Sequence, residues 1–512
     1  MAHPLSKASV VGVIGAGAMG AGIAQVAAMS GHPVVLFDID PVAVDKALSG
    51  IAASLAKLAD KGRLTKVQAD AATRNVIAAT ALTELKHAAL VIEAVAERLD
   101  VKQRIFGELE SIVDEHCIFA TNTSSISVTA IAASLRDPSR LAGLHFFNPA
   151  PVMALVEVVS GLATSPAIID TLHETAVAWG KLPVRARSTP GFIVNRVARP
   201  FYAEALRVLN EQASDVATVD RIMRGAGGFR MGPFELMDLI GHDVNFAVTE
   251  SVFRAMFFDQ RFTPSLIQQE LVSAGFLGRK SGRGFYRYAA GDSSAEASIE
   301  PSKQAAGRIS VARSGALLHP LVERLAKAAG ENCVDSTRDI PGLVAEIGGA
   351  LLLITDGQTA TRRARDLEHD DVVLVDLALD YGTARTLAVT RASQCSRAAF
   401  DAVVGTLQQC GYEVASISDV AGMVVMRTVA MLVNEAADAV NQGVCSVPDL
   451  DLAMEKGVNY PAGPLKWADA IGVATVHRVL FNLVAHYGED RYRISPLLAD
   501  RYWSAATFYP SI

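Results

Sequence analysis

The 512-residue sequence has few cysteines, no excess of positive charge and no long uninterrupted apolar run. Its five cysteines form no CxxC pair and no metal-ligand spacing, which excludes a disulfide framework or a zinc ribbon and favours a reducing compartment. Charged residues make up 20% of the chain and the formal net charge is −7, so we do not expect a nucleic-acid partner. No apolar stretch is long enough to span a bilayer, and we expect no membrane partner. The length exceeds what one core supports, so several domains are expected.

A glycine-rich turn is the strongest positive signal in the sequence. Residues 15–20 read Gly-Ala-Gly-Ala-Met-Gly and directly follow the apolar run 8–14. A helix is predicted at 18–29, and a second apolar run, 34–37, ends at Asp38. The order of strand, glycine turn, helix, strand and acid is typical of a dinucleotide-binding unit.

Each glycine of this turn has a physical role in that interpretation. Gly15 permits the tight turn, Gly17 lets a pyrophosphate approach the backbone, and Gly20 lets the helix pack close to the sheet. Asp38 lies where a carboxylate accepts the ribose hydroxyls of an adenosine, which favours NAD over NADP. The alternative is a purely structural turn. Lys7 and the apolar run after it superficially resemble a signal peptide, but cleavage there would destroy the turn, so the cytosol is expected.

Strand and helix signals alternate as far as residue 184 and predict a parallel, doubly wound α/β sheet. After it the apolar spacing becomes helical, then returns to short strands without a glycine motif, and finally becomes helical again. The predicted strands of the first sheet include 89–93, 117–120, 142–147 and 154–159. We therefore predict a Rossmann domain at 1–188, a helical domain at 189–288, a linker at 289–307, a degenerate Rossmann-like domain at 308–405 and a second helical domain at 406–512.

The last segment repeats the first helical one. The motif beginning at Pro190-Gly191 matches Ala421-Gly422, and the motif beginning at Gly232-Pro233 matches Gly463-Pro464. The spacing is 231 residues in both cases (422 − 191 and 463 − 232). The sequence therefore predicts an array of sheet domain and helical domain, present twice.

A histidine and a glutamate on neighbouring predicted strands form a candidate base. His145 ends one strand, and Glu157 lies inside the next apolar strand, where an unpaired carboxylate would be costly. Glu157 would then orient the imidazole of His145 and stabilise its protonated form. The alternative is a structural buried histidine with an unrelated glutamate.

Two further polar positions complete the candidate site. Ser124 lies in the run Thr-Asn-Thr-Ser-Ser at 121–125, after a strand end, where α/β sheets bind ligands. Its alternative role is a helix N-cap. Asn195 lies on an otherwise apolar face of the first helix of the helical domain and needs a polar partner, although a core asparagine is also possible.

These motifs together resemble the L-3-hydroxyacyl-CoA dehydrogenases, from Lys7 to Tyr288 and in the right order. The resemblance implies a Rossmann domain followed by a helical domain like that of 6-phosphogluconate dehydrogenase. It implies NAD as cofactor, no metal, an acyl-CoA substrate, His145 as base, Glu157 as its partner, and Ser124 and Asn195 as substrate contacts. It also implies NAD contacts at Gly15, Ala16, Gly17, Ala18, Met19, Gly20, Asp38, Glu97, Lys102, Ser124, Asn148 and Lys280, and CoA contacts at Ser54, Lys61 and Ser124. Without the family, Lys61 and Lys102 would be interpreted as solvated helix lysines.

The whole-chain layout resembles the longer dehydrogenases of phenylacetate degradation, which oxidise 3-hydroxyadipyl-CoA. Met426 stands where the repeat would place Asn195, and the second half has no glycine motif, so one active site per chain is expected. Arg196, Arg199 and Arg230 are candidates for binding a distal carboxylate. Short relatives are dimers that pack helical domain on helical domain, so we expect an intrachain pseudo-dimer, with a homodimer also possible.

Three other functions remain as alternatives: a dehydrogenase for (S)-3-hydroxybutyryl-CoA or for general fatty-acid β-oxidation, the dehydrogenase part of a multifunctional protein, and a non-catalytic, crystallin-like NAD-binding protein. No hydratase-like segment remains to be assigned, which disfavours the second. The third is disfavoured because every catalytic position is filled.

Overall fold

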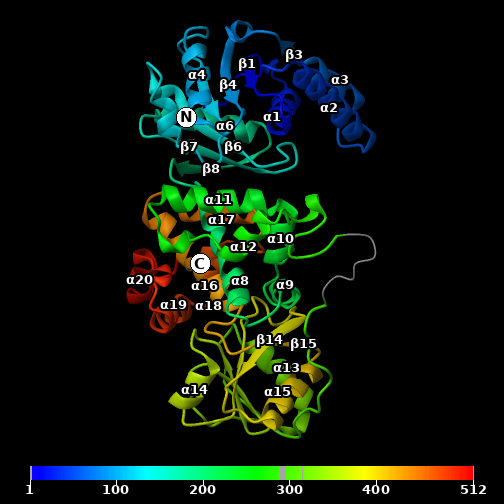
Figure 1. Cartoon of the computed structure of the whole chain (residues 1–512), viewed down its shortest axis with the longest axis vertical. Helices are drawn as coiled ribbons and strands as arrows, with labels where there is room; N and C mark the ends of the chain where they lie inside the picture. Colours follow the sequence, from blue (N-terminus) through cyan, green and yellow to red (C-terminus); the bar gives the residue numbers. More distant parts are fainter. Residues whose placement is uncertain (1–2, 289–295, 314, 511–512) are drawn as a thin grey trace. The chain divides into compact units, whose positions relative to one another are not determined.

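The computed structural model describes residues 3–288, 296–313 and 315–510, which form two compact units (Figure 1). The first unit comprises Met1–Arg196 together with Gln442–Val458. The second comprises Val197–Asn441 together with Asn459–Ile512. Residues 289–295 of the predicted linker lie outside the described residues.

An eight-stranded sheet forms the centre of the described part of the first unit, in the order β3-β2-β1-β4-β5-β6-β7-β8. Its strands are β1 (Val10–Ile14), β2 (Val34–Phe37), β3 (Val76–Ala79), β4 (Ala88–Glu93), β5 (Ile118–Thr121), β6 (Leu141–Phe146), β7 (Leu155–Ser160) and β8 (Leu182–Arg187). All neighbours are parallel except β6 and β7, whose connection contains no crossover helix. The predicted doubly wound sheet is therefore confirmed, with one antiparallel pair that the sequence analysis did not foresee.

Helices cover this sheet because its strands are apolar on both faces. They are α1 (Ala18–Met29), α2 (Pro41–Asp60), α3 (Lys66–Arg74), α4 (Leu99–Leu109), α5 (Val128–Ala132) and α6 (Pro166–Ala178), followed by α7 (Val194–Val197) at the end of the unit's first segment. Small residues on α1, such as Ala24 and Ala27, are fully buried and let it pack close to the strands. The predicted bounds of α1 are confirmed.

The second unit contains most helices of the two predicted helical domains. They are α8 (Arg199–Asn210), α9 (Val216–Gly225), α10 (Pro233–Ile240), α11 (His242–Ala255), α12 (Leu266–Ser273), α16 (Val425–Asn441), α18 (Pro464–Ile471), α19 (Val473–Tyr487) and α20 (Pro496–Trp503). Nearly every residue of α16 is buried, and α16 packs against α8. The first and second helical regions therefore contact each other within this unit.

A smaller mixed sheet completes the second unit, in the order β10-β9-β11-β12-β13-β14-β15. Its strands are β9 (Ile309–Val311), β10 (Cys333–Asp335), β11 (Leu343–Ile347), β12 (Ala350–Ile354), β13 (Val372–Val375), β14 (Thr386–Arg391) and β15 (Glu413–Ser416), with helices α13 (His319–Ala329), α14 (Ala360–Asp366) and α15 (Arg397–Gln409). Its last four strands pair parallel, antiparallel and parallel, as β5 to β8 do.

The sequence repeat extends into this smaller sheet. Strand β14 begins 231 residues after β7 (386 − 155), and α15 begins 231 residues after α6 (397 − 166). The second sheet therefore copies the last strands of the first sheet, and its described residues contain no counterpart of the β1–α1–β2 nucleotide-binding part.

One helix of the second helical region packs on the eight-stranded sheet, and one helix of the first helical region packs on the smaller sheet. Helix α17 (Val447–Gly457) packs on β7 and β8 in the first unit, and α9 packs on β14 in the second. In the first unit the Arg187 N–H donates to the Val444 carbonyl (2.8 Å), and in the second the Ser418 N–H donates to the Ala213 carbonyl (2.9 Å). These pairs are related by the same spacing (418 − 187 and 444 − 213). The exchange explains why a segment predicted to belong to the last domain is part of the first unit.

Residues 298–300 of the predicted linker contact both helix α9 and the smaller sheet. The Ser298 N–H donates to Thr218 Oγ1 (2.7 Å) and the Glu300 N–H to the Val414 carbonyl (2.8 Å), so this stretch of the predicted linker runs along β15. Of the described helices, none is singly long and apolar enough to cross a membrane; the bent pair α18 and α19 passes that test only together, by length and composition.

Candidate active site

The turn between β1 and α1 leaves room for an anion and no room for side chains. Gly15 has φ 101°, and a Cβ there would lie 2.5 Å from the Ala94 carbonyl oxygen. A Cβ at Gly20 would lie 1.7 Å from the Gly15 carbonyl oxygen. At Gly17 nothing lies within 4 Å, and no side chain caps the start of α1. The free N–H groups of this helix start suit a pyrophosphate, so the turn fits a dinucleotide.

Asp38 lies directly beside the same turn. Its Oδ2 accepts from the Ala16 N–H (2.7 Å), and its Oδ1 accepts from the Asp40 N–H (3.0 Å). A cavity of about 510 Å³ adjoins the turn and is lined by Gly17 and by residues of α1 and α2. Asp38 is half-buried at the tip of β2, where dinucleotide-binding folds place an acid for the ribose hydroxyls, and its contact with NAD remains a prediction.

A buried ion pair supports the next loop of the site. Lys102 on α4 is 1% exposed, and its Nζ lies 2.7 Å from Glu93 Oε1 and 3.2 Å from Glu97 Oε2. Without the family resemblance, Lys102 is predicted to be a solvated helix lysine. That prediction is wrong, because α4 turns this side chain toward the carboxylate at the end of β4. Sequence analysis missed Glu93, although a glutamate ending an apolar strand carries the same signal as Glu157.

Glu97 holds the loop that carries Ser124. Its Oε1 accepts from the Thr123 hydroxyl (2.6 Å) and from the backbone N–H groups of Ser124 (3.0 Å) and Ser125 (3.1 Å). Burial favours a raised pKa for Glu97, but these hydrogen bonds and the charge of Lys102 outweigh it and lower the pKa. An ionised Glu97 therefore orders the loop at neutral pH.

His145 and Glu157 lie directly opposite each other on the antiparallel strands β6 and β7. The His145 Nδ1 is 2.6 Å from Glu157 Oε2, and both side chains are buried. The other carboxylate oxygen, Oε1, accepts from the N–H groups of Ile193 and Val194, both at 3.0 Å. Glu157 is thus held from two sides, and it leaves the Nε2 of His145 as the nitrogen available for proton transfer.

Asn195 lies next to the Ser124 loop. Its Nδ2 donates to the Ser124 carbonyl oxygen at 3.5 Å, and both residues are partly exposed. The preceding Phe192, in the left-handed region with φ 47°, has its ring centroid 5.9 Å from that of His145. The structure therefore brings His145, Glu157, Ser124 and Asn195 together in the first unit.

Family models match most of the chain. A model described as "3-hydroxyacyl-CoA dehydrogenase, NAD binding domain" covers residues 10–189. The corresponding C-terminal domain model covers 191–288 and again 422–505, and a model of a reduced Rossmann-fold domain of 3-hydroxybutyryl-CoA dehydrogenase covers 352–420. The chain belongs to the 3-hydroxyacyl-CoA dehydrogenase family.

Similar proteins include long and short relatives. A "3-hydroxyadipyl-CoA dehydrogenase" of Escherichia coli K12 is 46% identical over 96% of this chain and 97% of its own length. A "probable 3-hydroxybutyryl-CoA dehydrogenase" of Bacillus subtilis is 40% identical over 54% of this chain and 96% of its own length. The crystal structure of an E. coli K12 3-hydroxybutyryl-CoA dehydrogenase has a TM-score of 0.87 and 44% identity, covering 98% of this chain and 99% of that one. This dehydrogenase therefore catalyses the NAD-dependent oxidation of 3-hydroxyacyl-CoA.

The other cofactor and CoA positions implied by the resemblance lie in different surroundings. Asn148 is exposed after β6, and Ser54 is half-buried on α2. Lys61 is exposed at the end of α2. Lys280 belongs to the second unit, where it forms an ion pair with Asp243. The solvent-exposed position of Lys61 agrees both with a CoA contact and with an ordinary surface lysine. The contacts of all four residues with NAD or CoA remain predictions.

The second half of the dehydrogenase has no counterpart of the base His145. It has a buried carboxylate that resembles Glu157 but lies at a different position of the repeat. The repeat spacing puts Asp376 at the His145 position and Ala388 at the Glu157 position. Asp376 is fully buried and accepts from the N–H groups of Val424 (2.9 Å), Val425 (2.7 Å) and Met426 (3.0 Å) at the start of α16. Burial raises the pKa of Asp376 to about 6. The copy therefore retains the helix-holding function of Glu157 without an imidazole.

Proposed function

We propose that the dehydrogenase oxidises (S)-3-hydroxyacyl-CoA with His145 as the general base and Glu157 as its positioning partner. The observation that carries this proposal is the 2.6 Å contact between His145 Nδ1 and Glu157 Oε2, with Glu157 held by two backbone N–H groups. His145 Nε2 takes the hydroxyl proton, and Glu157 stabilises the imidazolium that forms. NAD, when bound, accepts the hydride from C3. Ser124 and Asn195 hold the oxygen at the reacting carbon, so little reorganisation is needed.

We further propose 3-hydroxyadipyl-CoA, an intermediate expected for phenylacetate degradation, as the preferred substrate. The support is the E. coli relative of that name, which matches both halves of the chain. The second candidate is (S)-3-hydroxybutyryl-CoA, supported by the name of the similar E. coli crystal structure.

The five cysteines are all free in the described part of the chain and fit a reducing, cytoplasmic location.

The two candidate substrates differ in whether the acyl chain ends in a charge. Of the three arginines predicted to bind a distal carboxylate, Arg230 is exposed, whereas Arg196 is buried and donates to Gln442 Oε1 (2.9 Å). Arg199 is buried beside Thr249. A buried guanidinium gains most from a carboxylate partner, because little water competes for it.

A specificity profile with three substrates tests the proposed preference. The chain-length-matched pair is 3-hydroxyadipyl-CoA and 3-hydroxyhexanoyl-CoA, which differ only at the distal end, and 3-hydroxybutyryl-CoA is the short comparator. We expect kcat/KM for the adipyl substrate to exceed that for the hexanoyl substrate by at least about tenfold, the usual worth of a charge-assisted hydrogen bond. A higher kcat/KM for either uncharged substrate would contradict the proposed substrate but leave the reaction intact.

A further inference from the structure

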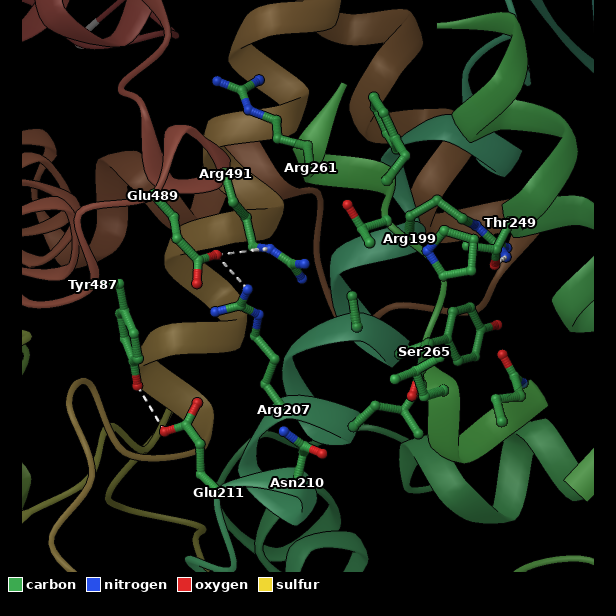
Figure 2. A pocket seen from close by; sticks show the side chains of 18 residues that line it. Arg199, Arg207, Asn210, Glu211, Thr249, Arg261, Ser265, Tyr487, Glu489 and Arg491 are labelled. Carbon is green, nitrogen blue, oxygen red and sulfur yellow. Dashed lines mark hydrogen bonds and ion pairs between the residues drawn. The ribbon is translucent and has the colours of Figure 1, made fainter. Parts of the chain in front are cut away.

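A cavity of about 370 Å³ lies within the second unit (Figure 2). It is lined by residues of α8, by Thr249 of α11, by the segment 261–266 and by residues 487–491. One part of its wall is apolar, with Leu206, Phe262 and Pro264. Four arginines also line it, so the cavity combines positive charge with an apolar surface.

Three of these arginines have carboxylate partners. Arg207 and Arg491 share Glu489, and Arg261 lies 3.1 Å from Glu435 and 2.8 Å from Asp438. Figure 2 shows the dashed contacts of Glu489 with both arginines. Each of these three guanidinium groups therefore has at least one carboxylate of the protein within ion-pair distance.

Arg199 differs from the other three. It is 6% exposed, and among the described residues no carboxylate lies within ion-pair distance of it. Its Nη1 donates to the Thr249 hydroxyl (3.1 Å), and its guanidinium lies 4.9 Å from the centre of the Tyr202 ring. The buried Nε of Arg199 has no hydrogen-bond partner, as is also true of Arg207, Arg261 and Arg491, so the missing carboxylate alone sets Arg199 apart. A hydroxyl and an aromatic face do not neutralise a buried charge, which is costly when left unpaired.

A second polar group near Arg199 is also unsatisfied. The hydroxyl of Tyr460, in the motif Gly-Val-Asn-Tyr-Pro at 457–461, is buried without a hydrogen-bond partner. Tyr460 and Arg199 interact electrostatically, and burial lowers the pKa of Arg199 with only Tyr202 and Tyr460 opposing it. Of these two groups only Arg199 lines the cavity, and an unpaired buried guanidinium at a cavity wall indicates a missing acceptor.

We propose that this cavity, which we call the Arg199 pocket, binds the carboxylate of an aliphatic organic acid. The guanidinium of Arg199 supplies a planar fork that matches a carboxylate, and its lack of a carboxylate partner leaves room for one monoanion. The apolar wall formed by Leu206, Phe262 and Pro264 suits a hydrocarbon chain and is unsuited to inorganic phosphate. The carboxylate belongs either to a free acid or to the distal end of a dicarboxylic acyl chain, and both sources share this chemistry.

Isothermal titration of the full-length protein with hexanoate tests the proposal. Hexanamide is the neutral comparator of the same shape, and inorganic phosphate is the comparator with charge but no chain. We expect saturable binding of one hexanoate per chain, and weaker binding of hexanamide and phosphate by at least about tenfold, as for the loss of a charge-assisted hydrogen bond. No hexanoate binding, equal binding of hexanamide or tighter binding of phosphate would overturn the proposal.

Arg199→Met should abolish hexanoate binding, whereas the matched control Arg254→Met, an exposed arginine on α11, should leave it unchanged. Equal hexanoate affinity in Arg199→Met and the unmodified protein would overturn the proposal. If Arg199→Met does not fold, Arg199→Lys keeps the charge and Ala203→Leu fills the cavity. Both should then weaken binding, and unchanged binding in both would overturn the proposal.

Turnover of Arg199→Met identifies the source of the carboxylate. A lower kcat/KM for 3-hydroxyadipyl-CoA with an unchanged value for 3-hydroxyhexanoyl-CoA would assign the pocket to the substrate's own distal end. Unchanged values for both, with hexanoate binding lost, would assign it to a free acid. Either result supports a carboxylate pocket. If the unmodified enzyme does not prefer 3-hydroxyadipyl-CoA, the proposed substrate is wrong, but the measured hexanoate affinity still tests the pocket.

Discussion

Glu157 combines a structural contact and a chemical contact in one carboxylate. One oxygen accepts two backbone N–H groups at the start of a helix, and the other lies 2.6 Å from the imidazole of His145. In the second half, Asp376 makes only the structural contacts. This comparison separates the two roles and suggests that a carboxylate was needed at this helix start whether or not a base was present.

Glu157→Gln should keep the helix contacts and lose the charge that stabilises the imidazolium. We expect turnover to fall by about 10²-fold, at the low end of general-base contributions, because His145 remains in place. The double variant with His145→Gln should be little slower than His145→Gln alone, since coupled residues are not additive. Steady-state NADH formation measures both, and a double variant slowed by the product of the two single effects would contradict the coupling.

Asp38 should decide the choice of cofactor. Its carboxylate lies beside the Ala16 N–H at the glycine turn, where a 2′-phosphate would meet a negative charge. We expect a strong preference for NAD, and Asp38→Ala should weaken NAD use and narrow the gap to NADP. Comparing kcat/KM for the two cofactors tests this, and equal use of both by the unmodified enzyme would refute it.

At the scale of elements, the start of α16 depends on one buried acid. Burial raises the pKa of Asp376 from 3.8 to about 6, so the folded state binds its proton more tightly than the unfolded state does. The stabilisation from this group is therefore fully present below about pH 4 and is lost as the pH rises through about 6.

Asp376→Asn removes this titration and keeps an acceptor for the N–H groups of α16. Between pH 4 and pH 7 the unmodified protein should lose about 1–3 kcal/mol of unfolding free energy relative to the variant. Urea unfolding at a series of pH values measures the difference. A stability difference that stays constant across this range would show that Asp376 does not titrate there.

Elements that depend on residues close together in the chain could be predicted from the sequence. The glycine turn, α1 and the apolar strands of the first sheet were predicted because the turn chemistry and the apolar runs lie within about 30 residues of each other. The exchange of α17 and α9 between the two sheets was not predicted, because it depends on contacts between segments far apart in the chain. Burial of Lys102 was likewise missed, since a helix pattern does not show which lysine meets Glu93.

At the scale of the whole molecule, the second half supplies surfaces that the first half needs. Helix α17 packs on β7 and β8, and α16 packs on α8. We propose that the two helical regions mimic, within one chain, the dimer of the short relatives. The reciprocal hydrogen bonds of Arg187 and Ser418 support this proposal.

Cutting the chain after residue 290 should expose the apolar surfaces that α16 and α17 cover. The fragment 1–290 keeps His145, Glu157, Ser124 and Asn195, so we expect it to aggregate or to regain activity as a homodimer. Light scattering combined with NADH-formation assays measures both. A soluble, active and strictly monomeric fragment would contradict the pseudo-dimer proposal.

The central claim is that one base, His145, serves the single active site of the chain. The most direct test is the turnover number of full-length His145→Gln with 3-hydroxyacyl-CoA and saturating NAD, with NADH binding and the circular dichroism spectrum as folding controls. We predict a loss of about 10²–10⁴-fold with NADH binding retained, the range typical of general-base catalysis. Near-normal turnover in a folded His145→Gln protein would contradict the account.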